Sequence, residues 1–201
     1  MRARSHAMCA LEQPPLLADE YGLNCQFDQE EPMPKPDEFN TAILDAVKQI
    51  AAEWPEKGYD INSYFTHNLQ YGPDCCLRAN HPPKTMCVAA VSEVIVAALT
   101  GWYQKSGDKR PFEKLPLRSW LGGTKKDIRG HIFMYDGFAS NGTAHALERF
   151  GIGRQVAFSG LEPGGFINFN RTRPSGHACI FLSFIDARGN DLVQRAIRHE
   201  A

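Results

Sequence analysis

The sequence has no excess of charge of either sign, with 22 Lys and Arg residues against 23 Asp and Glu. No stretch combines basic residues with interleaved aromatic ones, as a nucleic-acid surface would, so nucleic acid is not an expected partner. The longest apolar run, residues 88–99, is interrupted by Ser92 and Glu93 and falls far short of a bilayer-spanning length. We therefore expect a soluble protein without a membrane span.

Cysteine is also scarce, and the start of the chain lacks the apolar segment of a signal peptide. Six cysteines in 201 residues are too few for a disulfide scaffold. One disulfide from Cys75 or Cys76 to Cys25 or Cys9 remains open, and it would fit an oxidising compartment. Residues 1–10 indicate a cytosolic chain, a mature chain, or one exported by a route that needs no such peptide.

Proline divides the chain into an arm and a domain. Residues 1–36 hold five prolines with acidic residues between them, a composition that favours extended backbone. We interpret them as an arm on a catalytic domain of residues 37–201. The 43% hydrophobic residues suffice for one sizeable core.

Apolar residues recur at helical spacing in three places. A helix is expected over residues 37–54. The clearest one runs from about residue 85 to 103, with Thr85 as its N-cap, because Pro82 and Pro83 prevent extension backwards. A short helix is expected from residue 140 or 141 to 150, and residues 118–123 are expected to form a loop.

The spacing of apolar residues changes from helical to strand-like toward the end of the chain. Residues 165–170 and 177–185 are expected to form strands, and the turn between them predicts a hairpin. A second turn, residues 187–190, leads into a last strand. Residues 56–84 have no clean period and predict a long ordered loop, a kind of segment that often borders functional sites.

Cys87 falls in the first turn of the expected second helix. Free backbone N–H groups and the positive end of the helix dipole there favour the thiolate, the form of cysteine that attacks carbonyl groups. The alternative is a buried cysteine with a purely structural role, because cysteine is among the most often buried residues.

A base for such a nucleophile must come from elsewhere in the fold. His177 is the best candidate, because it opens a long apolar strand directly after Gly176, where the main chain can approach a helix end. The remaining histidines carry no motif and are interpreted as surface or satisfied core groups: His67, His81, His131 and His145.

Three stretches together resemble the NlpC/P60 and CHAP cysteine hydrolases. Residues 161–170, Leu-Glu-Pro-Gly-Gly-Phe-Ile-Asn-Phe-Asn, are similar to the family's Gly-Asp-aliphatic strand, although Gly165 stands where its Asp is usual. Residues 175–182, Ser-Gly-His-Ala-Cys-Ile-Phe-Leu, are similar to its Gly-His-aliphatic strand. Residues 85–90, Thr-Met-Cys-Val-Ala-Ala, resemble the start of its nucleophile helix, although Val88 replaces the usual small residue.

The resemblance implies a bacterial, papain-like cysteine hydrolase of α+β class, with a nucleophile helix packed on an antiparallel sheet and residues before Cys87 roofing the cleft. It implies an amidase or endopeptidase that cuts peptidoglycan stem peptides through a thioester, with Cys87 as nucleophile, His177 as base and no cofactor. Tyr71 resembles a tyrosine that some members place near the oxyanion hole.

Two residues are candidates to orient His177. If the turn of residues 171–176 is symmetric, Asn168 lies directly opposite His177 on the same face of the hairpin. If the second turn is symmetric, His177 instead meets the chain end near His199 or Glu200. The family takes its third residue from that following strand, so the resemblance favours His199 and proximity favours Asn168.

Two other classes of function stay open. Cys75, Cys76, His81 and Cys87 are residue types that zinc accepts, although their spacing lacks the usual C-x-x-C pair. An inactive binding module of the same fold is the second. Among enzymes, the lack of an export signal or wall-binding repeat favours either a periplasmic or secreted antibacterial effector or a shortened chain. An effector would have an inhibitor protein in the producing cell as its partner.

Overall fold

A computed structural model describes residues 36–53, 58–73, 75–79, 84–170 and 176–189. The chain divides into two units, Met1–Met33 and Pro34–Ala201, and all described residues belong to the second. The expected arm of residues 1–36 therefore lies almost entirely outside the described residues, as does the strand expected after residue 190.

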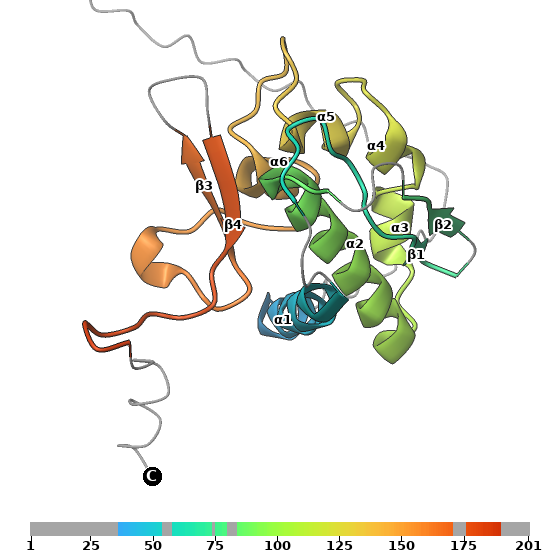
Figure 1. Ribbon diagram of the computed structural model, residues 1–201. Helices are drawn as coiled ribbons and strands as arrows, with labels where there is room; N and C mark the ends of the chain where they lie inside the picture. Colours follow the sequence, from blue (N-terminus) through green and yellow to red (C-terminus); the bar gives the residue numbers. More distant parts are fainter. Residues whose placement is uncertain (1–35, 54–57, 74, 80–83, 171–175, 190–201) are drawn as a thin grey trace, which may run out of the picture. The chain divides into compact units, whose positions relative to one another are not determined.

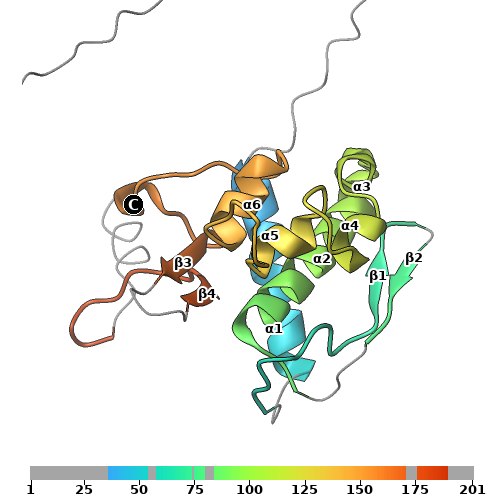
Figure 2. The same cartoon turned by 90° about the horizontal axis from the view of Figure 1, so that it is seen from above.

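Helix α2 (Cys87–Ser106) is the centre of the described part, and half of its residues are buried. It packs against α1 (Pro36–Glu53), against β1 (Leu69–Tyr71) and against β4 (Gly176–Ile180). Figures 1 and 2 both draw α2 between the elements that pack on it. Both long helices were predicted within about three residues of their observed ends.

The contact between α1 and α2 follows from the helical stripe of α1. Its buried face, Ala42, Ile43, Ala46 and Ile50, forms one apolar cluster with Val94 and Ala98 of α2. These residues recur at intervals of one, three and four, so they share one side of the helix. Gly107 ends α2 in the left-handed region, with φ of 74°, and its N–H donates to the carbonyl of Tyr103 at 2.7 Å.

Four short helices follow α2: α3 (Arg110–Lys114), α4 (Arg118–Leu121), α5 (Ile128–Ile132) and α6 (Thr143–Arg149). Trp120, Ile128 and Ile132 of this region are at most 1% exposed and belong to the main core. The prediction of a loop over residues 118–123 was wrong, because α4 forms its first four residues. The helix expected near residues 140–150 is α6.

Two small antiparallel sheets complete an α+β fold. The first, β1 with β2 (Cys75–Leu77), lies in the segment for which no regular structure was predicted. The second is the predicted C-terminal hairpin, β3 (Phe166–Asn170) with β4, although β4 ends at Ile180 and not near residue 185. The turn expected after residue 186 is present, with the N–H of Gly189 donating to the carbonyl of Asp186 at 2.9 Å.

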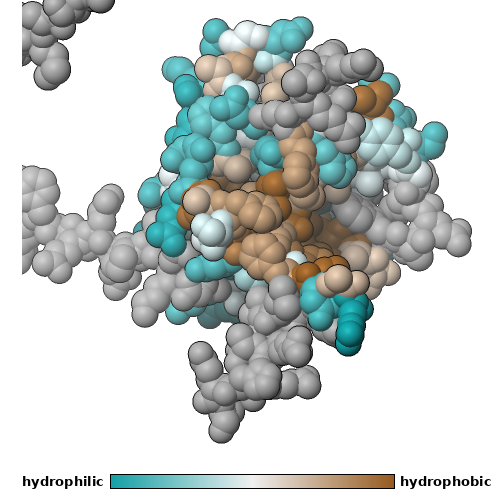
Figure 3. Space-filling model, turned by 90° about the vertical axis from the view of Figure 1, so that its left-hand side faces the viewer, coloured by the Kyte–Doolittle hydropathy of each residue, from teal (hydrophilic) through white to brown (hydrophobic). Residues whose placement is uncertain are grey.

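Several apolar side chains in the hairpin and in the segments before and after it are exposed. Phe169 of β3 is 51% exposed, and Phe158 before the hairpin and Leu182 and Ile185 after it are each more than half exposed. Figure 3, which looks at the side of the molecule where β3 and β4 lie, has apolar surface near its centre.

By length and composition alone, α2 could cross a membrane. The core helix of a soluble protein passes the same test, and most of the apolar window of α2 is buried against other elements.

Candidate functional site

Cys87 is the first residue of α2, and its thiol is free and half-buried. The N-cap is Met86, one residue later than the predicted Thr85, and Met86 makes no side-chain capping bond. The first hydrogen bond at this helix end runs from the N–H of Ala90 to the carbonyl of Met86, at 2.9 Å. The N–H groups of residues 87–89 thus have no acceptor within the helix and can serve an anion beside the thiol.

The chain before Cys87 is fixed by backbone pairing with residues 58–60. The N–H of Thr85 donates to the carbonyl of Gly58, and the N–H of Asp60 donates to the carbonyl of Thr85, each at 3.0 Å. Tyr59 and Thr85 form an isolated parallel bridge. The start of α2 is therefore held by a segment that comes from well before it in the sequence.

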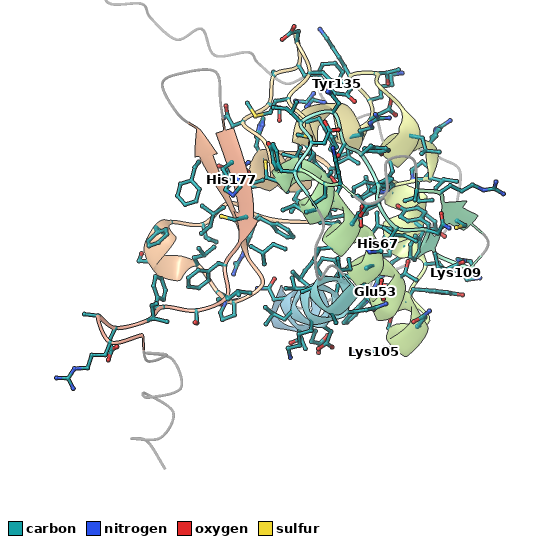
Figure 4. The ribbon with its side chains drawn as sticks, in the orientation of Figure 1. Glu53, His67, Lys105, Lys109, Tyr135 and His177 are labelled. Atoms are coloured by element: carbon teal, nitrogen blue, oxygen red, sulfur yellow. The ribbon has the colours of Figure 1, made fainter. Side chains whose placement is uncertain are left out.

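The same segment is attached to α2 again at Glu93. The carboxylate of Glu93 is fully buried and accepts hydrogen bonds from the backbone N–H of Thr66 and from its hydroxyl, the latter at 2.9 Å. It also contacts Nδ1 of His67 at 2.5 Å, and Nε2 of His67 lies 3.7 Å from Glu53 of α1. Figure 4 labels His67 and Glu53, which lie close together. Segment 58–67 therefore runs along the first two turns of α2.

His177 is the second residue of β4, and its side chain is exposed. It pairs with Phe169, and its neighbour Ala178 is only 4% exposed and belongs to the core cluster that contains Val91 of α2. Because side chains alternate along a strand, His177 lies on the opposite face from Ala178 and on the same face as Cys179. Figure 4 labels His177 on β4.

Cys179 is the second residue with a reactive side chain on this face of β4. Its half-buried thiol contacts the carbonyl oxygen of Ile167 at 3.8 Å. Burial raises the pKa of the Cys179 thiol, and the nearby Cys87 raises it further.

Cys87 and His177 lie on two elements that pack against each other, α2 and β4. Within the described part of the chain, no hydrogen bond joins their side chains. A catalytic hydrogen bond is often long or absent before substrate binds. Cys179 was not among the predicted site residues, although its spacing of two residues from His177 on a strand indicates that both share a face.

The prediction that Asn168 lies opposite His177 was wrong. Asn168 pairs with Ala178, so its side chain lies on the other face of the hairpin. There its Oδ1 accepts a hydrogen bond from the backbone N–H of Ala144 in α6, at 2.9 Å. Asn168 therefore cannot hold the imidazole of His177 directly.

The prediction that Tyr71 lies near an oxyanion hole was also wrong. Its hydroxyl donates to the carbonyl of Leu115 and accepts from the indole N–H of Trp120 at 2.7 Å, in the core. Its neighbour Gln70 is bound through its carbonyl to the hydroxyl of Thr100, at 2.7 Å. Thr100 is 13 residues after Cys87, which corresponds to ~20 Å along a helix.

The remaining candidate residues either lie outside the described part of the chain or lie away from the start of α2. His199, Glu200 and His81 lie outside the described residues, as do Cys9 and Cys25. Cys76 is a free, exposed cysteine on β2, whose partner strand packs beside the second half of α2 and not at its start. Among the described residues, no group of three or more potential ligands could hold a metal ion.

No protein-family model, curated protein or solved structure matches this chain.

Proposed function

We propose that this protein is a cysteine hydrolase of papain-like, NlpC/P60 type, with Cys87 as nucleophile and His177 as base. The observation that carries the proposal is the position of Cys87. A free thiol begins a helix whose first N–H groups have no side-chain cap, and the helix packs on the strand that holds a histidine. A helix start with these groups favours thiolate formation and binds developing negative charge.

The proposed reaction has two halves. His177 takes the thiol proton, and the sulfur of Cys87 attacks the carbonyl carbon of an amide, so that the carbonyl oxygen becomes an oxyanion. The backbone N–H of Cys87 and a second donor of the first helical turn hold this oxyanion. The protonated imidazole then gives its proton to the leaving amine, and a thioester remains.

Water completes the cycle. His177, now neutral, removes a proton from a water molecule that attacks the thioester carbon. The bond to sulfur breaks, a carboxylate leaves, and Cys87 regains its proton. The reaction consumes one water per amide and needs no redox partner or cofactor.

The proposed substrate is an amide of the peptide stem of peptidoglycan. Support for this class comes from the likeness of residues 161–170 and 175–182 to the strands of NlpC/P60 and CHAP hydrolases. A wall substrate places the protein in the periplasm or outside the cell. An effector of this kind would be held inactive in the producing cell by an inhibitor protein.

The test is cleavage of purified peptidoglycan fragments, with products identified by mass spectrometry. We expect the parent to release peptides, Cys87→Ala to release none, and His177→Ala to be slower by about 10²-fold or more. Cys76→Ser is the matched control, because it removes another free thiol far from the start of α2, and it should keep full activity.

Two outcomes would contradict the proposal. The first is cleavage by the Cys87→Ala variant at the parent rate. The second is a folded parent that cuts no fragment and whose Cys87 also resists alkylation, since a nucleophile must be reachable.

A further inference from the structure

Asn168 connects the C-terminal hairpin with helix α6. Its Oδ1 accepts the N–H of Ala144, the second residue of α6. That N–H belongs to the first helical turn, which has no acceptor within the helix. The N-cap is Gly142, which has no side chain to supply one. Asn168 thus performs, from a strand 24 residues away, the role that a capping side chain performs locally.

Gly142 makes this approach possible. Its φ of 97° lies in the region that side chains disfavour, and a Cβ placed on it would overlap the amide of Asn168. Thr143, the next residue, is fully buried. The contact between hairpin and helix is therefore a close-packed junction and not a surface contact.

The junction sets the position of His177 through strand pairing. Asn168 is paired with Ala178, and Phe169, the residue after Asn168, is paired with His177. Ala178 packs into the core on the face opposite the imidazole. A shift of β3 on α6 would therefore move β4 with it, and the imidazole would change its place relative to Cys87.

We propose that Asn168 is a positioning residue for His177. It fixes where the paired strands lie against the helical part of the protein, and it does not touch the reacting atoms. The proposal rests on the Cys87–His177 pair proposed above. A displacement of about 1 Å in a reacting group can lower a rate by about 10²-fold, so a single hydrogen bond at this junction has a measurable effect.

The experiment measures how fast iodoacetamide alkylates Cys87 as a function of pH, with the modified peptide resolved from those of Cys76 and Cys179 by mass spectrometry. We expect His177→Ala to change this pH profile of the alkylation rate, because the imidazole is the proton acceptor of the thiol. Asn168→Ala should change the profile in the same direction and should slow fragment cleavage by up to about 10²-fold.

Two variants separate positioning from general loosening. Asn168→Asp keeps an oxygen that accepts the N–H of Ala144, so it should recover most of the parent profile. Asn68→Ala is the matched control, because Asn68 also accepts one distant backbone N–H, that of Ala79 at 2.8 Å, on the other hairpin. It should keep the parent profile.

Gly142→Ala disturbs the same junction without removing the amide of Asn168, since the new Cβ would displace that amide. It should act like Asn168→Ala, and it keeps the test decisive if Asn168→Ala does not fold. The positioning role is overturned if folded Asn168→Ala or Gly142→Ala keeps the parent profile while His177→Ala changes it, or if Asn68→Ala changes the profile equally. If His177→Ala itself leaves the profile unchanged, the Cys87–His177 pair fails first.

Discussion

Glu93 offers the sharpest test of how the start of α2 is held. Glu93 is 0% exposed and is the seventh residue of α2, within a largely apolar stretch of the helix. It accepts the backbone N–H and the hydroxyl of Thr66 and contacts the ring of His67. Glu93→Ala removes this acceptor and leaves the three donor groups in place.

The expected cost follows from the burial of these groups. Thr66 is 5% exposed, and a buried donor that loses its acceptor costs about 1–3 kcal/mol. His67 keeps some solvent contact and a second carboxylate, Glu53 at 3.7 Å, so the loss of Glu93 at His67 adds only moderately to the free-energy cost. Because the N–H and the hydroxyl of Thr66 both lose the carboxylate, we expect Glu93→Ala to cost about 1–3 kcal/mol or more. Glu93→Gln keeps one carbonyl oxygen and should cost less.

Urea unfolding followed by far-ultraviolet circular dichroism measures the free energy of unfolding for both variants. Glu113→Ala, an exposed glutamate on α3, is the control and should stay within about 0.5 kcal/mol of the parent. A loss of less than about 1 kcal/mol in Glu93→Ala would refute the reasoning, since it is below the cost of even one orphaned buried donor.

Two further predictions concern stability. Gly107→Ala should destabilise the protein by about 1 kcal/mol, because φ at Gly107 is 74°. Gly101 lies inside α2 with open space around a new Cβ, so Gly101→Ala should stabilise the protein by about 0.5–1 kcal/mol. Thermal unfolding that ranks the two variants in the opposite order would contradict this. A hydrogen bond from Arg110 lowers the pKa of Asp108, so the carboxylate adds stability above its unfolded pKa of about 3.9 and loses it as pH falls through the lower folded value. Asp108→Asn should therefore lose less of its unfolding free energy between pH 5 and about pH 2 than the parent, in urea titrations at both values.

The two long helices and the C-terminal hairpin could be predicted because their signals are strong. Apolar residues recur at helical spacing through both helices, and Trp54-Pro55 and Pro82-Pro83 mark a stop and a start. The short helices between residues 110 and 132 gave no such signal. Four or five residues make little more than one turn, too few to establish a period.

The position of Asn168 could not be predicted because strand register depends on the turn. A symmetric turn would pair Asn168 with His177, but the observed register pairs Phe169 with His177. A slip of one residue moves every side chain to the other face. The candidate third residue thus became a residue of the junction with α6.

Tyr71 and Cys179 were misjudged for a related reason. Tyr71 was given a role only through the resemblance, in a segment expected to be a long ordered loop, but its ring packs against Phe112 and Trp120 in the core. Cys179 lies in an apolar run that gave no sign of a neighbouring thiol. Both outcomes depend on contacts between segments far apart in the sequence, and these contacts are not encoded in any local pattern.

The order of the chain has a consequence for how the pair of Cys87 and His177 is assembled. The elements up to and including the helix that carries the thiol, α1, β1, β2 and α2, follow one another in sequence and pack largely on each other. The strand with His177 comes from the other end of the described chain, so its contact with α2 closes a long loop. During synthesis the N-terminal elements also emerge first. We therefore expect the helix that carries the thiol to form before the imidazole arrives, so that a nascent chain holds no assembled pair.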